Sequence, residues 1–235
     1  MVLKAKLLGW KELAPEVHHF DFEVPGRQEL NFTPGQFVSL LEKVDGKEIT
    51  RAYSIASPRG GNHFALCLNR VPDGLLSSFL FTLRPGEEVE MHEPLGYFTL
   101  RHPGRRAVFV ATGTGIAPFR SMLLDHLPRT QPHITLLFGT RHEQGLLYRE
   151  DMERMAREFE TFRFLPTLTR PGESWQGRTG RVQAHLDEAL NLRSPEEMIN
   201  IDVYVCGLKE MVDDVRHELK RRGFDRKQII YEKYD

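Results

Sequence analysis

The chain has 235 residues, with 32 lysines and arginines against 33 aspartates and glutamates, so its net charge is −1. A balance so close to zero argues against a protein whose dominant surface binds nucleic acid. No apolar run is long enough to span a bilayer, and charges interrupt the first residues before a signal-peptide core forms, so a cytoplasmic location is expected. Two cysteines, Cys67 and Cys206, cannot build a four-thiolate zinc or iron–sulfur site, and we expect no metal site. An electron carrier in this chain would be organic, with any iron–sulfur centre on a partner.

Short strands separated by proline- and glycine-containing turns are expected up to about residue 100. They are predicted at Lys4–Trp10, Val17–Val24, Gln36–Leu41, Ile49–Ala56, His63–Val71 and Glu87–His92. A short helix is predicted over Leu75–Leu83, with Ser77 or Ser78 near its start. Many short strands at this spacing favour a closed antiparallel barrel or a sandwich.

The pattern changes near residue 104, after which apolar strands alternate with amphipathic helices. Strands are predicted at Ala107–Ala111, His133–Gly139, Phe162–Leu168, Val203–Cys206 and Gln228–Tyr231. The helices between them are predicted at Pro118–Leu127, Leu147–Phe159, Val182–Leu190 and Lys209–Arg222. Strands interleaved with helices imply a parallel, doubly wound sheet, here of five strands. We therefore expect two domains, residues 1–103 and residues 104–235.

The segment Arg51-Ala52-Tyr53-Ser54 alternates an arginine, an aromatic ring and a hydroxyl with small residues. On a strand, Arg51 and Tyr53 would share one face and Ser54 would point to the other. Arginine offers a fork of donors for a phosphate, tyrosine a flat ring and serine a small donor and acceptor. A flavin nucleotide could use all three. The alternative is an edge strand with an exposed arginine and a half-buried tyrosine.

Two further segments suit a phosphate-containing ligand. The helix that follows Gly74 would present unpaired N–H groups to a pyrophosphate, or it would only plug one end of the barrel. The turn Gly113-Thr114-Gly115-Ile116 joins a strand to a helix, and its glycines let the backbone approach a dinucleotide, with Pro118 in the first helical turn. A tight turn without a ligand is the alternative, and a proline stands where the usual fingerprint has its third glycine.

Six motifs occur in the order found in the ferredoxin–NADP reductase family, which the chain resembles over essentially its full length. They are Pro34-Gly35-Gln36-Phe37, Arg51-Ala52-Tyr53-Ser54, Gly74-Leu75-Leu76-Ser77, Gly113-Thr114-Gly115-Ile116-Ala117-Pro118, Cys206-Gly207-Leu208 and Tyr231-Glu232-Lys233-Tyr234. The resemblance implies an FAD-binding barrel followed by a nicotinamide-nucleotide-binding α/β domain. It also implies an enzyme that exchanges hydride with NADP(H) and passes electrons to or from a ferredoxin or flavodoxin.

The resemblance also implies roles for single residues. Ser54, Cys206, Glu232 and Tyr234 would form the hydride-transfer site, with Tyr234 stacked on the flavin as a movable lid, although Asp235 follows it where close plant-type relatives end. The expected contacts with the flavin nucleotide are Arg51, Ala52, Tyr53, Ser54, Leu68, Gly74, Leu75, Leu76, Ser77, Thr114 and Tyr234. The expected contacts with the nicotinamide nucleotide are Gly113, Gly115, Ile116, Pro118, Thr140, Arg141, Thr169, Arg170, Arg181, Cys206 and Gly207.

The choice between NADPH and NADH depends on the ends of the second and third parallel strands. Thr169-Arg170 resembles the hydroxyl–arginine pair of NADP-preferring members, so NADP(H) is favoured over NAD(H). Arg181 stands where those members often have a tyrosine, and Thr140-Arg141 also resembles some NADH users. Two alternatives therefore stay open: an NADH-preferring reductase component of a multicomponent oxygenase that feeds a separate iron–sulfur protein, and a binding module that has lost the chemistry.

Overall fold

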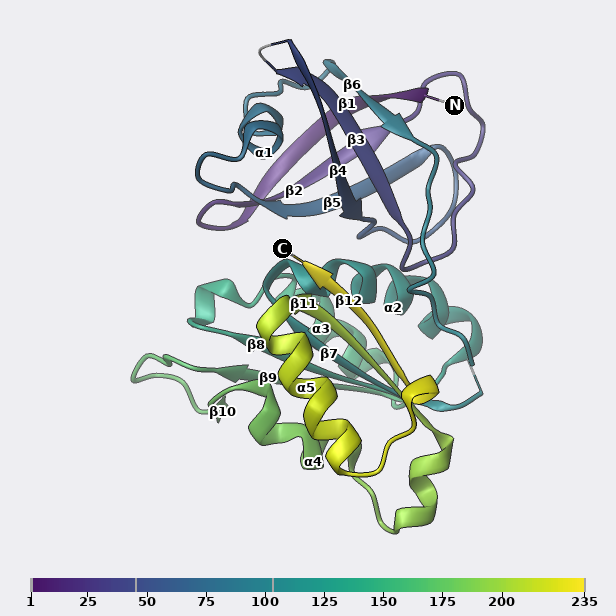
Figure 1. The fold of residues 1–235 in the computed structure, drawn as a ribbon, viewed down its shortest axis with the longest axis vertical. Coiled ribbons are helices and arrows are strands. Elements are labelled where there is room, and N and C mark those ends of the chain that lie inside the picture. Colours follow the sequence, from purple (N-terminus) through teal and green to yellow (C-terminus); the bar gives the residue numbers. More distant parts are fainter. Residues whose placement is uncertain (1, 45, 103, 235) are drawn as a thin grey trace. The chain divides into compact units, whose positions relative to one another are not determined.

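The computed structural model describes residues 2–44, 46–102 and 104–234 and divides the chain into two compact units. The first unit comprises residues 1–100 with residues 117–125, and the second comprises residues 101–116 with residues 126–235. Figure 1 shows that strands dominate the first unit, whereas helices and strands alternate in the second. The predicted domain boundary after Pro103 falls on a residue outside the described ranges and stays a prediction. Among the helices described, none is long and apolar enough to span a membrane.

The first unit is an antiparallel barrel, as the spacing of its strands predicted. Its six-stranded sheet has the order β4-β3-β6-β1-β2-β5, and a bridge between Ile55 and Leu66 joins the residue after β4 to β5. The strands are β1 (Val2–Ala14), β2 (Val17–Glu23), β3 (Phe37–Val44), β4 (Lys47–Ser54), β5 (His63–Asn69) and β6 (Glu88–His92). Apolar side chains alternate along these strands and point inward, because every second residue of a strand faces the same side.

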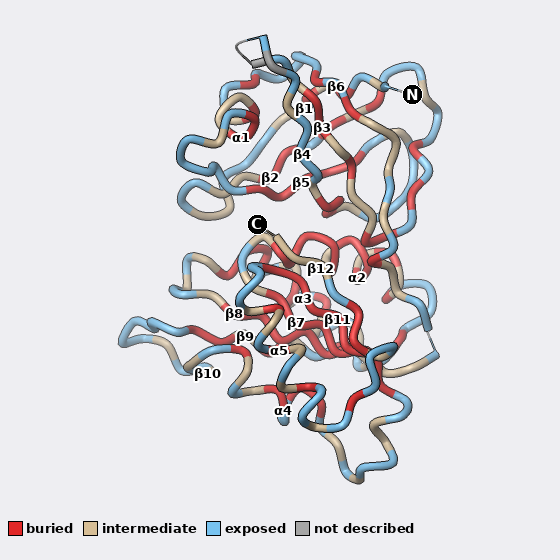
Figure 2. Tube along the Cα trace, in the orientation of Figure 1, coloured by how far each residue is buried: buried red, intermediate tan, exposed pale blue. Residues whose placement is uncertain are grey.

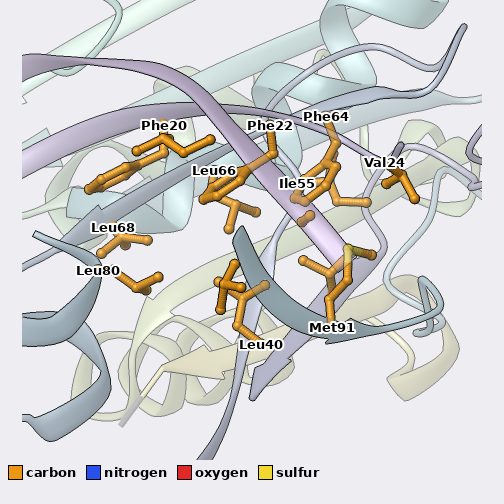
Figure 3. Close-up of a cluster of buried hydrophobic side chains, with 14 of the residues drawn as sticks. Phe20, Phe22, Val24, Leu40, Ile55, Phe64, Leu66, Leu68, Leu80 and Met91 are labelled. Atoms are coloured by element: carbon orange, nitrogen blue, oxygen red, sulfur yellow. The ribbon is translucent and has the colours of Figure 1, made fainter. Parts of the chain in front are cut away.

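The barrel interior is filled by aromatic and branched aliphatic side chains. Figure 3 shows Phe20 and Phe22 of β2 beside Leu40 of β3 and Leu66 of β5, and all four are almost fully buried. The helix α1 (Leu75–Leu80) contributes Leu80 to the same core. It is shorter than the predicted Leu75–Leu83, and Ser77 is its third residue, so the prediction of a serine near the helix start is confirmed. The backbone of Gly74 caps the helix without a side-chain hydrogen bond.

The second unit is built on a parallel six-stranded sheet of order β10-β9-β8-β7-β11-β12. The strands are β7 (Arg106–Thr112), β8 (Ile134–Thr140), β9 (Phe162–Leu168), β10 (Arg178–Thr179), β11 (Ile201–Leu208) and β12 (Ile229–Tyr234). The five predicted strands are present, and the predicted fold class is confirmed. The two-residue strand β10 was not predicted, because two residues are too few to show a periodic pattern.

Helices cover both faces of this sheet. They are α2 (Ala117–Thr130), α3 (Arg149–Glu158), α4 (Leu186–Leu190) and α5 (Lys209–Arg221), with short 3-10 turns at η1 (Gly113–Ile116), η2 (Glu143–Gly145), η3 (Val182–His185), η4 (Pro195–Asn200) and η5 (Arg226–Gln228). Figure 1 shows α5 in front of the sheet and α3 behind it. The front face buries a core formed by α4, α5 and alternate strand residues such as Val108, Leu137 and Leu165, and the buried strands are red in Figure 2.

Two predicted helices differ from the structure. The helix predicted over Val182–Leu190 is split into the 3-10 turn η3 and the five-residue α4. Helix α2 continues past the predicted end at Leu127, through Pro128, to Thr130. Proline removes one backbone hydrogen bond, and this loss is tolerated so close to the end of the helix.

The first half of α2 belongs to the barrel unit, and hydrogen bonds hold it there. An Nη1 of Arg120 donates to the carbonyl of Ala56 (2.8 Å), and the Ser121 hydroxyl donates to the carbonyl of Ser57 (2.6 Å). The Arg59 guanidinium donates to the Asp125 carboxylate, which is fully buried (3.0 Å). The loop after β4 is therefore attached to α2 at three points.

A buried carboxylate in β11 anchors the segment that leads into the second unit. Asp202 is 2% exposed and accepts from His102 Nδ1 (2.6 Å) and from Nη1 of Arg105 (3.1 Å).

We expect Asp202→Ala to lower the free energy of unfolding by about 1–3 kcal/mol, because a charge-assisted pair is lost while the half-exposed partners return to water. Urea unfolding measures the change. Asp187→Ala is the control, since its exposed pair with Arg222 should contribute less than about 1 kcal/mol; equal losses in both variants would contradict this role for Asp202.

Candidate functional site

The Arg51–Ser54 segment forms the end of β4 in the barrel unit. In the register with β3, Arg51 lies opposite Leu40 and Tyr53 lies opposite Val38, so both residues share a face, as predicted. The Tyr53 ring packs against the barrel core, and its burial raises the pKa of the phenol to about 12, although the charge of Arg51 opposes this shift. Arg51 is exposed, and among the described residues its guanidinium donates only to the neighbouring carbonyl of Thr50, through Nη1 (2.9 Å). This leaves a guanidinium able to bind an anion beside a fixed ring.

The loop before α1 uses the predicted serine internally. The Ser77 hydroxyl accepts from the backbone N–H of Val71 (3.1 Å) and donates to the carbonyl of Gly74 (3.2 Å). Leu76 is buried in the barrel core, and Leu75 is half exposed beside it. Leu68 is also buried in that core, so only its main chain is left for a ligand. A ligand at this end of the barrel would therefore meet backbone atoms and Leu75 rather than the Ser77 hydroxyl.

The turn between β7 and α2 is held against the end of β11. A Cβ on Gly115 would lie 2.4 Å from the carbonyl oxygen of Cys206 and 2.9 Å from the Cα of Gly207. Real Cβ atoms do not approach main-chain atoms so closely, so this position requires glycine. Gly113 adopts a positive φ of 54°, and Pro118 is the second residue of α2, as the sequence predicted. The turn thus leaves the strand edge with its backbone close to the neighbouring strand.

Cys206, Glu232 and Tyr234 lie together at the ends of β11 and β12. Cys206 is paired in register with Glu232, and Tyr234 with Leu208. Cys206 is a free cysteine and fully buried, and this burial raises the pKa of its thiol well above the usual value. The charge of Glu232 adds to the rise, whereas a hydrogen bond with Tyr234 opposes it. Cys206 is therefore a neutral thiol and not a thiolate nucleophile.

Three predicted arginines lie at the same edge of this sheet. The backbone N–H of Thr169 donates to the carbonyl of Thr140 (3.0 Å), and that of Arg170 donates to the carbonyl of Arg141 (2.8 Å). This pairing continues past the ends of β8 and β9 and sets Arg141 beside Arg170, both exposed. Neither guanidinium has an ion pair with a residue in the described ranges. Arg181 is also exposed, 4.0 Å from a carboxylate of Glu210.

A tryptophan in the loop between β9 and β10 shapes this edge and was missed. The Trp175 ring packs against Gly177, and its Nε1 donates to the carbonyl of Arg178 (2.9 Å). The guanidinium of Arg149 lies 5.8 Å from the ring centroid. The sequence signal that could have indicated this role is an aromatic residue that stands between Gly172 and Gly177 in a loop. Arg178 itself is held by both carboxylate oxygens of Glu188, so it is less free to bind a ligand.

Each unit thus brings its own predicted residues together. In the barrel unit these are the β4 segment and the loop before α1; in the second unit they are the turn, the Cys206 group and the arginine edge. Within the described ranges, no group of three or more histidine, cysteine, aspartate or glutamate side chains is placed to hold a metal ion. The second unit presents backbone and cations for a phosphate-rich ligand.

Comparisons with known proteins agree with this arrangement. The family model described as an oxidoreductase FAD-binding domain matches residues 4–100, and that described as an oxidoreductase NAD-binding domain matches residues 109–217. A protein named ferredoxin–NADP reductase B of Sorangium cellulosum is 41% identical over 239 residues, which cover 99% of this chain and 97% of the relative.

A second relative is much longer than this chain. The toluate 1,2-dioxygenase electron transfer component of Pseudomonas putida is 32% identical over 208 residues, which cover 88% of this chain but only 60% of the relative. The crystal structure of a ferredoxin NADP+ reductase from Neisseria gonorrhoeae with bound FAD and NADP has a TM-score of 0.86. It covers 99% of this chain and 98% of its own, and at 24% identity it shows that the fold is shared.

Proposed function

Because the chain belongs to the ferredoxin–NADP reductase-like family of FAD-dependent oxidoreductases, we propose that it exchanges hydride with NADP(H) and passes electrons to or from a ferredoxin or flavodoxin. Residues 1–103 would form the FAD-binding domain and residues 104–235 the nicotinamide-nucleotide domain. The preference for NADP(H) over NAD(H) is supported by two exposed arginines, Arg141 and Arg170, at the edge of the parallel sheet.

The residues of the barrel unit fit a flavin nucleotide. The exposed Arg51 guanidinium suits a pyrophosphate, since its planar fork matches phosphate oxygens. The Tyr53 ring, fixed by packing, would lie against the flavin ring system, and its raised pKa keeps the phenol neutral at physiological pH. The Ser54 hydroxyl would hydrogen-bond the polar ring edge. Bound FAD supplies the hydride and single-electron chemistry.

The residues of the second unit would bind and orient the nicotinamide nucleotide. The η1 turn would receive its pyrophosphate, because backbone N–H groups at such a turn bind anions. The neutral Cys206 thiol would border the reacting carbon without becoming charged. Glu232 would hold the carboxamide edge of the nicotinamide or a proton there, and Tyr234 would act as a lid that excludes water until the nucleotide binds.

NADPH preference rests on charge at the adenosine end of the nucleotide. A 2′-phosphate carries negative charge and oxygen acceptors, which two unpaired guanidiniums match. An NADH-using site would more often place a carboxylate on the ribose hydroxyls. Thr169 adds a hydroxyl beside Arg170. This pattern supports the NADP reductase function over its alternative.

The alternative is an NADH-preferring reductase component that feeds the iron–sulfur protein of an oxygenase. Its support is the 32% identity to the toluate dioxygenase component. The two functions differ in their nucleotide and in their protein acceptor. Both would use a separate iron–sulfur partner or a flavodoxin, because two cysteines cannot supply the four thiolates of a ferredoxin-type cluster.

The test is an anaerobic absorbance titration of the flavin-loaded protein with NADPH and with NADH in parallel. We expect NADPH to bleach the flavin at a lower concentration than NADH does. Arg170→Ala should lower the affinity for NADPH by about tenfold to hundredfold and leave the affinity for NADH unchanged. Arg157→Ala is the control, because Arg157 is an exposed arginine of α3. A preference for NADH in the parent protein would favour the oxygenase-reductase alternative, and equal responses to both nucleotides would contradict the NADPH preference.

A further inference from the structure

The second unit has a cavity of about 420 Å³ at the sheet edge opposite the η1 turn. It lies at the amino ends of three neighbouring strands: Arg106 is the first residue of β7, and Thr135 and Arg163 are the second residues of β8 and β9. A seven-residue strand is about 20 Å long, so this cavity is separate from the proposed nucleotide edge. None of the residues proposed to bind the flavin or the nicotinamide nucleotide lines this cavity.

The cavity exists because α4 is short. Val108 of β7, Leu137 of β8 and Leu165 of β9 belong to the core that α4 and α5 cover. Two residues earlier on the same face of each strand stand Arg106, Thr135 and Arg163, because the side-chain period of a strand is two. Helix α4 ends at Leu190, and Asn191 turns the chain away in a left-handed conformation with φ 44°. The face of the sheet that α4 covers therefore changes from apolar to polar side chains beyond the end of this helix.

One acidic side chain of the cavity is already engaged. An Nη2 of Arg106 donates to the carbonyl of Leu190 (2.6 Å), and its Nη1 lies 3.5 Å from the Glu197 carboxylate. The same carboxylate accepts from the backbone N–H of Arg193 (3.2 Å). Glu197 therefore fixes Arg106 and the loop after α4, and its charge is compensated by Arg106.

The remaining charges leave the cavity positive. Arg163 and Arg193 line it, and in the described ranges neither has a side-chain hydrogen bond or a salt bridge, although the charge of Arg163 helps to lower the pKa of Glu188 outside the lining. Glu160 is the other carboxylate of the lining, so two cations of the lining stand against one exposed anion.

We propose that this cavity binds a phosphate group, with the Arg163 and Arg193 guanidiniums as its cationic donors. A phosphate accepts several hydrogen bonds at once and is matched by the planar fork of arginine. The cavity is larger than inorganic phosphate needs, so a small phosphate ester would also fit. The shared chemistry is the phosphate dianion, and two probes separate its sources.

The experiment is isothermal titration calorimetry of the flavin-loaded protein with inorganic phosphate and, separately, with glucose 6-phosphate as a phosphate ester. We expect binding in the parent protein, a loss of about tenfold or more in Arg163→Ala and in Arg193→Ala, and partial retention in Arg163→Lys. Tighter binding of the ester would identify an ester site, and equal binding would identify a site for free phosphate.

Two controls keep the result specific to this cavity. Arg157→Ala removes a cation from the surface of α3 and should bind phosphate like the parent. Arg170→Ala removes a cation from the proposed nucleotide edge, so it should keep the phosphate binding that Arg163→Ala loses. Loss in Arg170→Ala but not in Arg163→Ala would place the phosphate at the nucleotide edge and overturn the proposal. Absence of binding of both probes to the parent protein would overturn it as well. NADPH titrations of Arg163→Ala should be unchanged, so failure here leaves the proposed enzyme function intact.

Discussion

Gly115→Ala is expected to reduce the rate of flavin reduction by NADPH by about a hundredfold while the protein keeps its flavin. The added Cβ would meet the carbonyl oxygen of Cys206 at 2.4 Å and its carbonyl carbon at 2.7 Å. These are main-chain atoms, so they cannot rotate away as a flexible side chain would. The turn and the end of β11 would have to separate by about 1 Å, and misplacement of that size is enough to disturb hydride transfer.

Stopped-flow reduction of the flavin measures this effect, with the flavin-to-protein absorbance ratio as the check on cofactor content. Gly104→Ala is the matched control, because a Cβ at Gly104 meets no atom within 4 Å and the substitution is the same. Normal reduction by NADPH in Gly115→Ala would show that the contact between the η1 turn and β11 does not position the nucleotide. Loss of flavin in the same variant would point instead to a general folding defect.

Arg51→Glu is expected to lose most of its FAD on purification, with affinity reduced by about a hundredfold or more. The substitution removes the guanidinium fork and places a negative charge beside the proposed pyrophosphate. The FAD affinity of Arg51→Lys should lie between those of the parent protein and Arg51→Glu, because lysine keeps the charge but not the planar fork. The measurements are the flavin content after purification and a fluorescence titration of the flavin-free protein with FAD.

The control for Arg51→Glu is Arg84→Glu, which makes the same charge change at an exposed arginine of the same unit. We expect Arg84→Glu to retain FAD like the parent protein. Retention of FAD by Arg51→Glu at the affinity of the parent would mean that the β4 segment is an ordinary barrel strand. A similar loss in both variants would indicate a general effect of net charge.

The fold could be predicted because its two halves differ in periodicity. Two-residue alternation with frequent turns indicated the barrel, and strands alternating with amphipathic helices indicated the parallel sheet. Element ends were less predictable, since α4 and β10 are set by tertiary contacts and are too short for a pattern. Val182–Leu190 reads as one helix in sequence, yet its first turn is a 3-10 turn in the structure.

The candidate site was predictable at the level of motifs but not of contacts. The sequence indicates that Ser77 is close to a helix start, but it cannot show that the hydroxyl is already bonded to Val71 and Gly74. Nor can it show that Arg178 is held by Glu188, whereas Arg170 has no ion pair with any residue that the structure describes. Such differences depend on partners from distant segments, and only the folded chain brings them together.

The attachment of α2 to the barrel has a consequence for how this protein can be divided. Residues 117–125 belong to the barrel unit although the chain reaches them only after the strand β7. A fragment that ends at residue 100 would lack the helix that receives bonds from the loop after β4, and a fragment that begins at residue 101 would carry that helix without its partners. Gene fusion and domain exchange are therefore expected to preserve both folds only where the two units are transferred together.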